Sequence, residues 1–173
     1  MKLTIMFFGV ALLLCSNAYA QSDNRRAQPE RCTPEAMTQS KMVDIIKQLV
    51  EKTQGPDNHL SFVYNDITIT MISDPAANRM RLVSAVIEAR DMSDQQVIAS
   101  LISNYHLALD ARYGIGNGVL FSTYIHPLAE LTKTQLLSAV RQVATLSKTF
   151  GTSYTSGELN FAVQPPEEDR IEI

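Results

Sequence analysis

The sequence predicts an α+β domain in which an antiparallel sheet packs against helices. In three segments, apolar residues recur every three or four positions, which is the period of an amphipathic helix. Between these segments lie five short stretches of extended character, most of which alternate apolar and polar residues as strands do. The turns between neighbouring strands are short, so adjacent strands should run antiparallel. The expected order is helix, three-strand meander, helix, β-hairpin, helix.

The first twenty residues predict a secretory signal peptide. Lys2 provides a short positive start, residues 4–15 form an apolar run, and a small-x-small cleavage motif ends at Ala20. A transmembrane anchor fits less well, because a helix needs ~20 apolar residues to cross a bilayer. A lipoprotein signal at Cys15 also fits less well, because Leu14 before it is not small. We therefore expect a periplasmic or secreted protein with no transmembrane segment in the mature chain.

The composition of the mature chain limits its partners. Removing residues 1–20 takes away one lysine and leaves 14 basic against 18 acidic residues, a formal charge of −4. A nucleic-acid partner is not expected, because binding one requires a basic face. Cys32 is then the single cysteine, so no disulfide within the chain is expected. In an oxidising compartment its thiol is buried, stays free or pairs with a second chain.

In the first half of the domain, one helix and three strands are expected. Residues 21–32 are polar and aperiodic, which predicts a flexible leader. The helix should run from about Thr33, as its cap, to Thr53, and the turn residues 55–58 should end it. The strands, joined by a two-residue turn and then by a longer one, are expected at Leu60–Tyr64, Ile67–Ile72 and Arg79–Glu88.

In the second half, a helix, a hairpin and a longer helix are expected. Ser93 and Gln96 have capping-box spacing, and an apolar stripe follows at Val97, Ile98, Leu101 and Ile102. That helix should end near Asn104. The extended segments are LALDARYGI and GVLFSTYIHP, and Asn117-Gly118 between them favours a tight turn because both positions accept positive φ. The last helix should run from Thr132 to Phe150, and residues 152–173 should form a mostly flexible acidic tail with a short strand at 157–163.

Several segments resemble the type III secretion chaperone-like (CesT-like) fold and, within it, the YbjN-like family of small bacterial proteins. They are Asn104, LALDARYGI, the Asn-Gly turn, VLFSTYIHPLAELT and TQLLSAVRQVATLSKTF, and the resemblance spans residues 33–151. It implies a sheet covered by helices and a tendency to form homodimers. Secretion chaperones of this fold bind extended client segments on exposed apolar patches, and YbjN-like proteins are described as regulators of sensory transduction. These chaperones are cytoplasmic, so the export signal is a departure that puts a role at the cytoplasmic face of a secretion machine in doubt.

No catalytic, cofactor-binding or metal-binding motif occurs in the sequence. His59, His106 and His126 are 47 and 20 residues apart, and no zinc motif has such spacings. The glycine-rich stretch 114–118 looks like a phosphate loop, but a strand follows it where a dinucleotide fingerprint needs a helix. We therefore predict no catalytic residue, no cofactor and no metal.

Two hypotheses about function follow. The first is an exported non-enzymatic protein that acts by protein–protein contact, in a chaperone-like, adaptor or regulatory role, as a homodimer with an unknown protein partner. In this hypothesis the candidate partner contacts are Tyr113, Phe121 and Tyr124. An exposed apolar patch over a filled core would favour it. An accessory role at the outer membrane is a further possibility.

The alternative is a small-ligand-binding or enzymatic domain with a pocket between the helices and the sheet. Its polar groups would come from Asp110, Arg112, Tyr124 or His126. A polar cavity in which Asp110 and His126 converge would favour this alternative.

Overall fold

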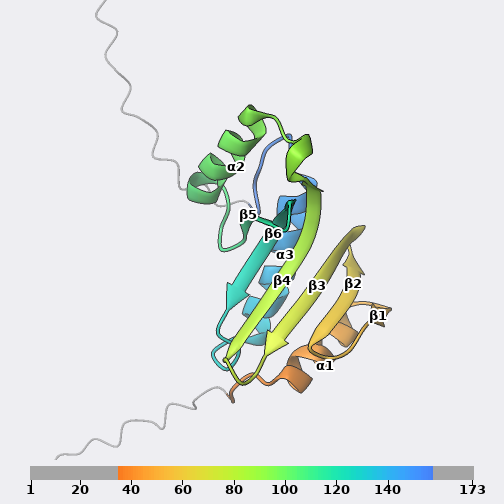
Figure 1. Ribbon diagram of the computed structural model, residues 1–173. Helices are drawn as coiled ribbons and strands as arrows, with labels where there is room; N and C mark the ends of the chain where they lie inside the picture. Colours follow the sequence, from red (N-terminus) through yellow and green to blue (C-terminus); the bar gives the residue numbers. More distant parts are fainter. Residues whose placement is uncertain (1–34, 158–173) are drawn as a thin grey trace, which may run out of the picture. The chain divides into compact units, whose positions relative to one another are not determined.

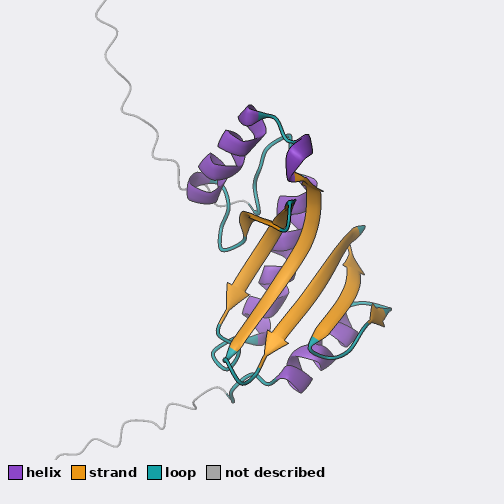
Figure 2. Ribbon diagram, in the orientation of Figure 1, coloured by secondary structure: helices purple, strands orange, loops and turns teal. Residues whose placement is uncertain are grey.

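A computed structural model describes residues 35–157 of the chain. Within these residues, six strands form one antiparallel sheet in the order β1-β2-β3-β4-β6-β5, accompanied by three α-helices (Figures 1 and 2). The predicted α+β class is therefore confirmed. The strands are β1 Thr53–Gln54, β2 His59–Tyr64, β3 Ile67–Asp74, β4 Arg79–Glu88, β5 Arg112–Gly116 and β6 Val119–His126. The helices are α1 Gln39–Leu49, the 3-10 turn Ala89–Asp91, α2 Asp94–His106 and α3 Lys133–Lys148.

The hydrophobic core lies between one face of the sheet and the helices α1 and α3. In Figure 1, α3 crosses behind β3, β4 and β6, and α1 lies behind the β1–β2 side of the sheet. Small side chains let α3 come close to the central strands, because Ser84 and Ser122 face each other across β4 and β6. The Ser122 hydroxyl donates to the Val143 carbonyl of α3 at 3.1 Å. Within residues 35–157, no helix covers the opposite face of the sheet.

Both predicted two-residue turns are confirmed by positive φ angles. Asn65 and Asp66 join β2 to β3 with φ of 48° and 64°. Asn117 and Gly118 join β5 to β6 with φ of 50° and 80°. Asn, Asp and Gly are the residues that adopt this left-handed region at least cost, and the turn it makes matches the twist of the strands.

The first helix is shorter than predicted at both ends. It begins after Thr38, whose hydroxyl caps the Lys41 N–H, and it ends at Leu49. The expected cap, Thr33, lies outside the described residues, but the residues just before Thr38 are not helical, so the prediction was wrong here. The chain leaves the helix early because residues 53–54 form the edge strand β1 beside β2.

The first hairpin strand is also shorter than predicted, since β5 begins at Arg112 and not at Leu107. The Leu107 N–H still bonds to the Ser103 carbonyl, so this residue ends α2. The next N–H groups then find partners other than a neighbouring strand. The Gln142 side chain of α3 accepts from Asp110 and Ala111, at 2.8 and 3.0 Å. A polar side chain of the helix therefore replaces the ladder over this stretch.

An asparagine side chain covers part of the outer edge of β5. The Asn104 Nδ2 donates to the Tyr113 carbonyl at 3.0 Å, and its Oδ1 accepts from the Tyr113 N–H at 2.7 Å. These two bonds copy those that a further antiparallel strand would make with Tyr113. The helix end that the sequence placed near Asn104 therefore also protects a strand edge.

Some predictions fall on residues that the structure does not describe. They are the signal peptide with its cleavage after Ala20, the leader at 21–32 with Cys32, and the strand at 157–163 beyond Gly157. No helix among residues 35–157 is both long enough and apolar enough to cross a membrane.

Candidate interaction surface and polar cavity

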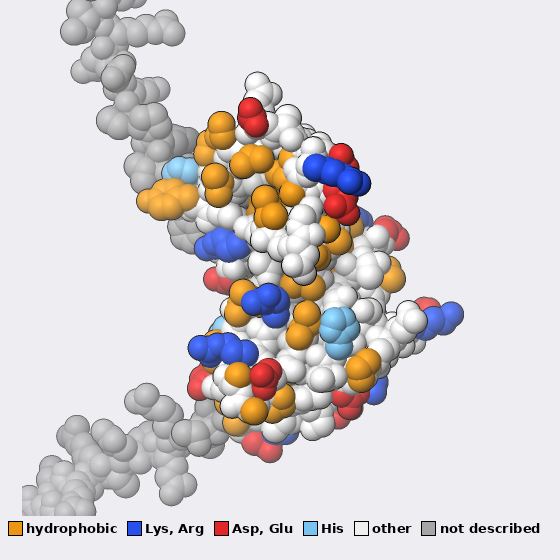
Figure 3. All heavy atoms as spheres, in the orientation of Figure 1, with side chains coloured by type: hydrophobic (Ala, Val, Ile, Leu, Met, Phe, Trp, Pro, Cys, Tyr) orange, Lys and Arg blue, Asp and Glu red, His pale blue; other side chains and the backbone are white. Residues whose placement is uncertain are grey.

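Helix α2 presents its large apolar side chains to solvent. Their exposed fractions run from 36% at Val97 to 77% at Tyr105, and Figure 3 shows hydrophobic side chains gathered over this helix. We call this set the α2 apolar face: Val97, Ile98, Leu101, Ile102 and Tyr105. The sequence correctly marked the stripe, but a stripe on an amphipathic helix usually faces the core. Here it faces away.

The buried side of α2 consists of serines. Ser100 and Ser103 are the two buried residues of the helix. The Ser103 hydroxyl donates to the Tyr154 carbonyl, and the Ser100 hydroxyl donates to the Gln96 carbonyl within the helix at 2.8 Å. The Ser103 and Asn104 bonds therefore attach α2 to the rest of the domain, and the helix buries no large apolar side chain there. The predicted capping box is confirmed, because the Ser93 and Gln96 side chains each bond to the other's backbone N–H.

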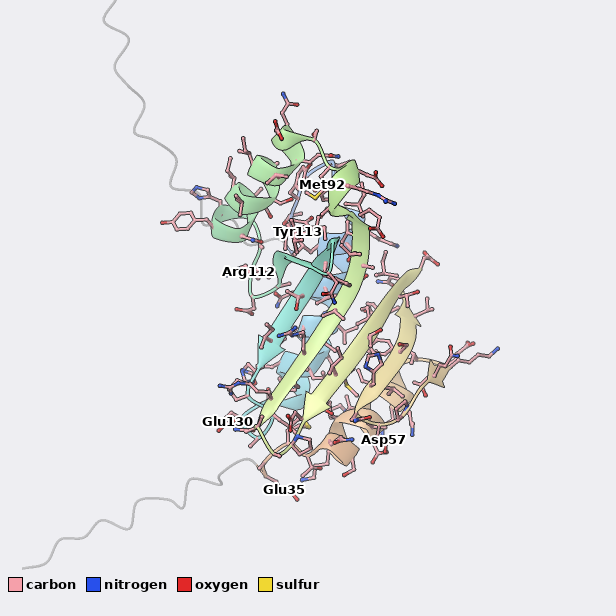
Figure 4. All side chains as sticks on the ribbon, in the orientation of Figure 1. Glu35, Asp57, Met92, Arg112, Tyr113 and Glu130 are labelled. Carbon is pink, nitrogen blue, oxygen red and sulfur yellow. The ribbon has the colours of Figure 1, made fainter. Side chains whose placement is uncertain are left out.

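Two of the three predicted contact residues are buried. Tyr113 and Tyr124 are only 6% and 5% exposed, because they lie on the sheet face that packs against α3. The Tyr113 hydroxyl donates to the Leu146 carbonyl of α3 at 2.6 Å, and Figure 4 places Tyr113 where β5 meets α2. Burial raises the pKa of Tyr113 well above its usual value. In the single chain these two tyrosines are therefore not exposed, and their role as partner contacts stays a prediction.

Phe121 lies half-buried on the open face of the sheet. The register pairs it with Ala85 on β4 and Gly114 on β5. A shallow cavity of about 350 Å³ lies on this face, lined by apolar side chains beside Arg81 and the β5–β6 turn. The large apolar residues are Ile72, Val83, Ile115, Phe121 and Ile125. Phe121 therefore remains a predicted partner contact.

A second cavity, also of about 350 Å³, is lined mainly by polar groups. It lies where the end of β6 and the start of β5 meet α3, and its lining is Asp110, Arg112, Tyr124, Ile125, His126, Gln135, Ser138 and Gln142. The structure therefore brings together all four polar residues that the sequence proposed for a ligand pocket. No group of three or more His, Cys, Asp or Glu side chains in the described chain could hold a metal ion.

Tyr124 is the most buried member of this cavity that could donate to a ligand. Burial raises the pKa of its hydroxyl, and the negative charge of Asp110 raises it further. The hydroxyl therefore stays protonated at neutral pH and acts as a hydrogen-bond donor. The Tyr124 ring stacks nearly parallel to the His126 ring, with centroids 6.1 Å apart and planes 8° apart.

Gln142 was not identified from the sequence as a residue that shapes this cavity. This side chain is buried on α3 among apolar neighbours, and it fixes the residues that form one wall of the cavity. A glutamine within the buried stripe of a helix is a signal that could have found it, because a buried amide needs hydrogen-bond partners.

Among known proteins, similarity is found at the level of structure. No protein-family model matches this sequence, and no curated protein matches it significantly. A structure of the Yersinia pestis type III secretion chaperone SycH, in complex with a stable fragment of YscM2, matches with a TM-score of 0.50 at 13% identity. That match covers 66% of this chain and 100% of the other. The chain has a type III secretion chaperone-like fold.

Two further complexes match slightly less well. The structure of the HopA1–SchA chaperone–effector complex gives a TM-score of 0.49 at 14% identity, covering 62% of this chain and 87% of the other. The ExsC–ExsE complex gives 0.49 at 11% identity, covering 65% and 92%. At identities this low, the chaperone-like fold is the property that the comparison establishes.

Proposed function

We propose that this protein is exported, has no enzymatic activity, and works by binding other proteins as a homodimer in a chaperone-like, adaptor or regulatory role. The observation that carries the proposal is the α2 apolar face. SycH, whose fold the chain shares, is a secretion chaperone solved with a fragment of YscM2, and this supports a role in protein contact. Membership of the YbjN-like family is a finer proposal that rests on the order of elements.

Helix α2 gains little stability from apolar packing within its own domain. Isolated helices shorter than ~12–15 residues are marginal in water, and most helices in proteins gain their stability by packing an apolar face. The 13 residues of α2 bury only two serines against the domain. Its five apolar side chains are left on the outside, where an apolar patch usually marks an interaction site.

A second copy of the chain suits this face. A two-fold axis brings the same patch of each copy together, so an apolar helix face can pack against its own image. The α2 apolar face contains no charged side chain, and Asp94 at the helix start is the single acidic residue of α2. Like charges would therefore not meet across the axis. Covering the exposed part of five side chains is worth about 1 kcal/mol each, or about 5 kcal/mol for each copy before the cost of association.

The oligomeric state of the mature chain, residues 21–173, tests the proposal. Light scattering after size exclusion should give the mass of a dimer for the wild type. The double variant Ile98→Glu/Leu101→Glu should give a monomer, because two carboxylates per copy would be buried without partners. Gln95→Glu adds one carboxylate at an exposed position of the same helix outside the α2 apolar face and should stay dimeric. A wild-type monomer at high micromolar concentration would remove self-association from the proposal.

Binding of a client is tested separately. Crosslinking in a periplasmic extract, followed by mass spectrometry, should recover a partner with the wild type and lose it when Phe121 or the α2 apolar face is changed. Recovery of abundant background proteins alone, with no dependence on these surfaces, would contradict a chaperone-like or adaptor role.

The proposed organisation of the chain is a signal peptide at 1–20, a leader at 21–32, a chaperone-like domain at 33–151 and an acidic tail at 152–173. Export is supported by the apolar run and the small-x-small motif at Ala20. Expression of the full chain in a Gram-negative host should give a periplasmic product whose first residue is Gln21. An uncleaved product in the cytoplasm would refute export.

A further inference from the structure

The polar cavity holds two opposite charges that do not pair with each other. Asp110 and Arg112 both line it, yet within residues 35–157 no ion pair joins them. Figure 4 marks Arg112 beside β5 at the outer part of the sheet. Each of these two side chains is instead held in place by hydrogen bonds to other groups of the protein.

Asp110 is held by α3. The Gln142 Nε2 donates to the Asp110 Oδ2 at 3.3 Å and to the Ser138 Oγ at 3.1 Å, and the Gln142 Oε1 accepts from the Asp110 N–H at 2.8 Å. Gln142 is itself only 5% exposed, so its amide cannot easily turn away. The carboxylate therefore has a fixed position at the cavity wall, and its second oxygen remains available to a ligand.

Arg112 is held by the backbone of the same loop. Its Nη1 donates to the Leu109 carbonyl and, at 2.8 Å, to the Ala111 carbonyl. A guanidinium has five N–H groups, so the donors on the other two nitrogens are left for a ligand. A guanidinium held in this way loses little side-chain entropy when it binds a carboxylate through two parallel hydrogen bonds.

The remaining polar groups complete the lining. The Tyr124 hydroxyl has no hydrogen-bond partner among the described residues, although the side chain is 5% exposed and lines the cavity. The His126 Nδ1 lies 2.7 Å from the Pro127 carbonyl, which can only accept, so Nδ1 carries a proton. In the neutral ring, Nε2 is then an acceptor. Ile125 adds an apolar surface at the rim.

We propose that this cavity binds a free α-amino acid, with the ammonium group on Asp110 and the carboxylate on Arg112. A simple anion would meet the Asp110 charge, and a simple cation would meet Arg112, so a ligand that carries both charges suits the cavity best. The volume of about 350 Å³ is at the small end of ligand sites, which fits a small molecule. The ligand's side chain would lie on Ile125.

Titration of the isotope-labelled mature protein with L-alanine, followed by amide NMR spectra, tests this site. Alanine should cause saturable shifts at residues 110, 112 and 126. Propionate and ethylamine, which each keep one of the two charges, should bind at least 10-fold more weakly, and glycerol should cause no saturable shift. Equal affinity for propionate would indicate an anion site, equal affinity for ethylamine a cation site, and the absence of saturable shifts with alanine at millimolar concentration no site. Each of these results would overturn the proposal.

Two variants sharpen the test. Asp110→Asn keeps an oxygen that can accept from Gln142 and removes the charge, so alanine should bind at least 10-fold more weakly. Asp91→Asn changes an exposed carboxylate outside the cavity and should bind alanine like the wild type. Unchanged affinity in Asp110→Asn would contradict the assignment. If this variant does not fold, the comparison of alanine with its two single-charge analogues on the wild type still decides the matter.

The proposal is independent of self-association, because none of the cavity residues belongs to α2. A monomeric Ile98→Glu/Leu101→Glu variant should bind alanine with the affinity of the wild type.

Discussion

Replacement of Leu101 by alanine should weaken the homodimer without weakening the fold of each copy. Leu101 is 64% exposed in the single chain, so its side chain contributes little to the core. Fully burying a leucine side chain is worth about 2 kcal/mol, and covering 64% of it at an interface is worth about 1.3 kcal/mol. A two-fold axis doubles the loss to about 2.5 kcal/mol, which raises the dissociation constant roughly 60-fold.

Sedimentation equilibrium over a range of concentrations measures this dissociation constant. Val63→Ala is the matched control, because Val63 is 58% exposed but lies on β2, at the other side of the sheet from β5. Its dissociation constant should equal that of the wild type. The melting temperature of the wild type should rise with protein concentration, and that of Leu101→Ala should rise less over the same range. Equal dissociation constants for Leu101→Ala and the wild type would refute the reasoning.

Three further substitutions test the contacts inside the domain by denaturant unfolding. Gln142→Leu removes the acceptor of two backbone N–H groups and should cost about 2–4 kcal/mol, and a loss below that range would show that water replaces the amide. Tyr113→Phe removes a buried hydrogen bond and should cost about 1 kcal/mol at pH 7. Burial raises the folded-state pKa of Tyr113 and of Tyr124. The stability that these two tyrosines contribute to the folded protein is therefore fully present below pH ~10 and is lost as the pH rises towards their folded-state pKa. Wild-type stability should therefore fall above pH ~10, and it should fall less steeply in Tyr113→Phe. Gly55→Ala should cost more than about 1 kcal/mol, because Gly55 has a φ of 100° and an added Cβ would clash with the His59 carbonyl oxygen. An unchanged unfolding midpoint would contradict this.

Local chemistry made much of the fold predictable. The turns at 65–66 and 117–118 need positive φ, and the residues there are those that tolerate it, so the pairing of β2 with β3 and of β5 with β6 followed from the sequence. The capping box at Ser93 likewise set the start of α2 within one residue. These features depend on neighbours in the chain, and the sequence shows such neighbours directly.

Features that depend on distant neighbours were not predictable in the same way. The apolar stripe of α2 was visible, but the hydroxyl of Ser103 and the amide of Asn104 bond to Tyr154 and Tyr113, and these bonds decide which side faces inwards. The alternation of side chains along β6 identified two faces of the strand, but it did not show that α3 covers the face that contains Tyr124. A periodic pattern identifies a face, whereas the tertiary fold decides what the face meets.

The polar cavity was predictable from the sequence only in part. Asp110, Arg112 and His126 were proposed as pocket residues because they are polar and lie near the hairpin, and the structure places them together. Gln142 was not proposed, since it stands 30 residues along the chain from Arg112 within an amphipathic helix, and only the packing of α3 brings it to the loop. Sequence reasoning therefore found the charged groups and missed the residue that positions them.

The bond between Asn104 and Tyr113 has a consequence for how this protein behaves at high concentration. A bare edge strand invites another strand, and repeated addition of strands leads to fibrils. At β5 the asparagine side chain already occupies the backbone N–H and carbonyl of Tyr113, so it opposes the addition of a further strand at this residue. Asn104→Ala would reopen that edge, and thioflavin fluorescence on prolonged incubation should rise faster than in the wild type. Unchanged kinetics would show that the edge is protected by other means.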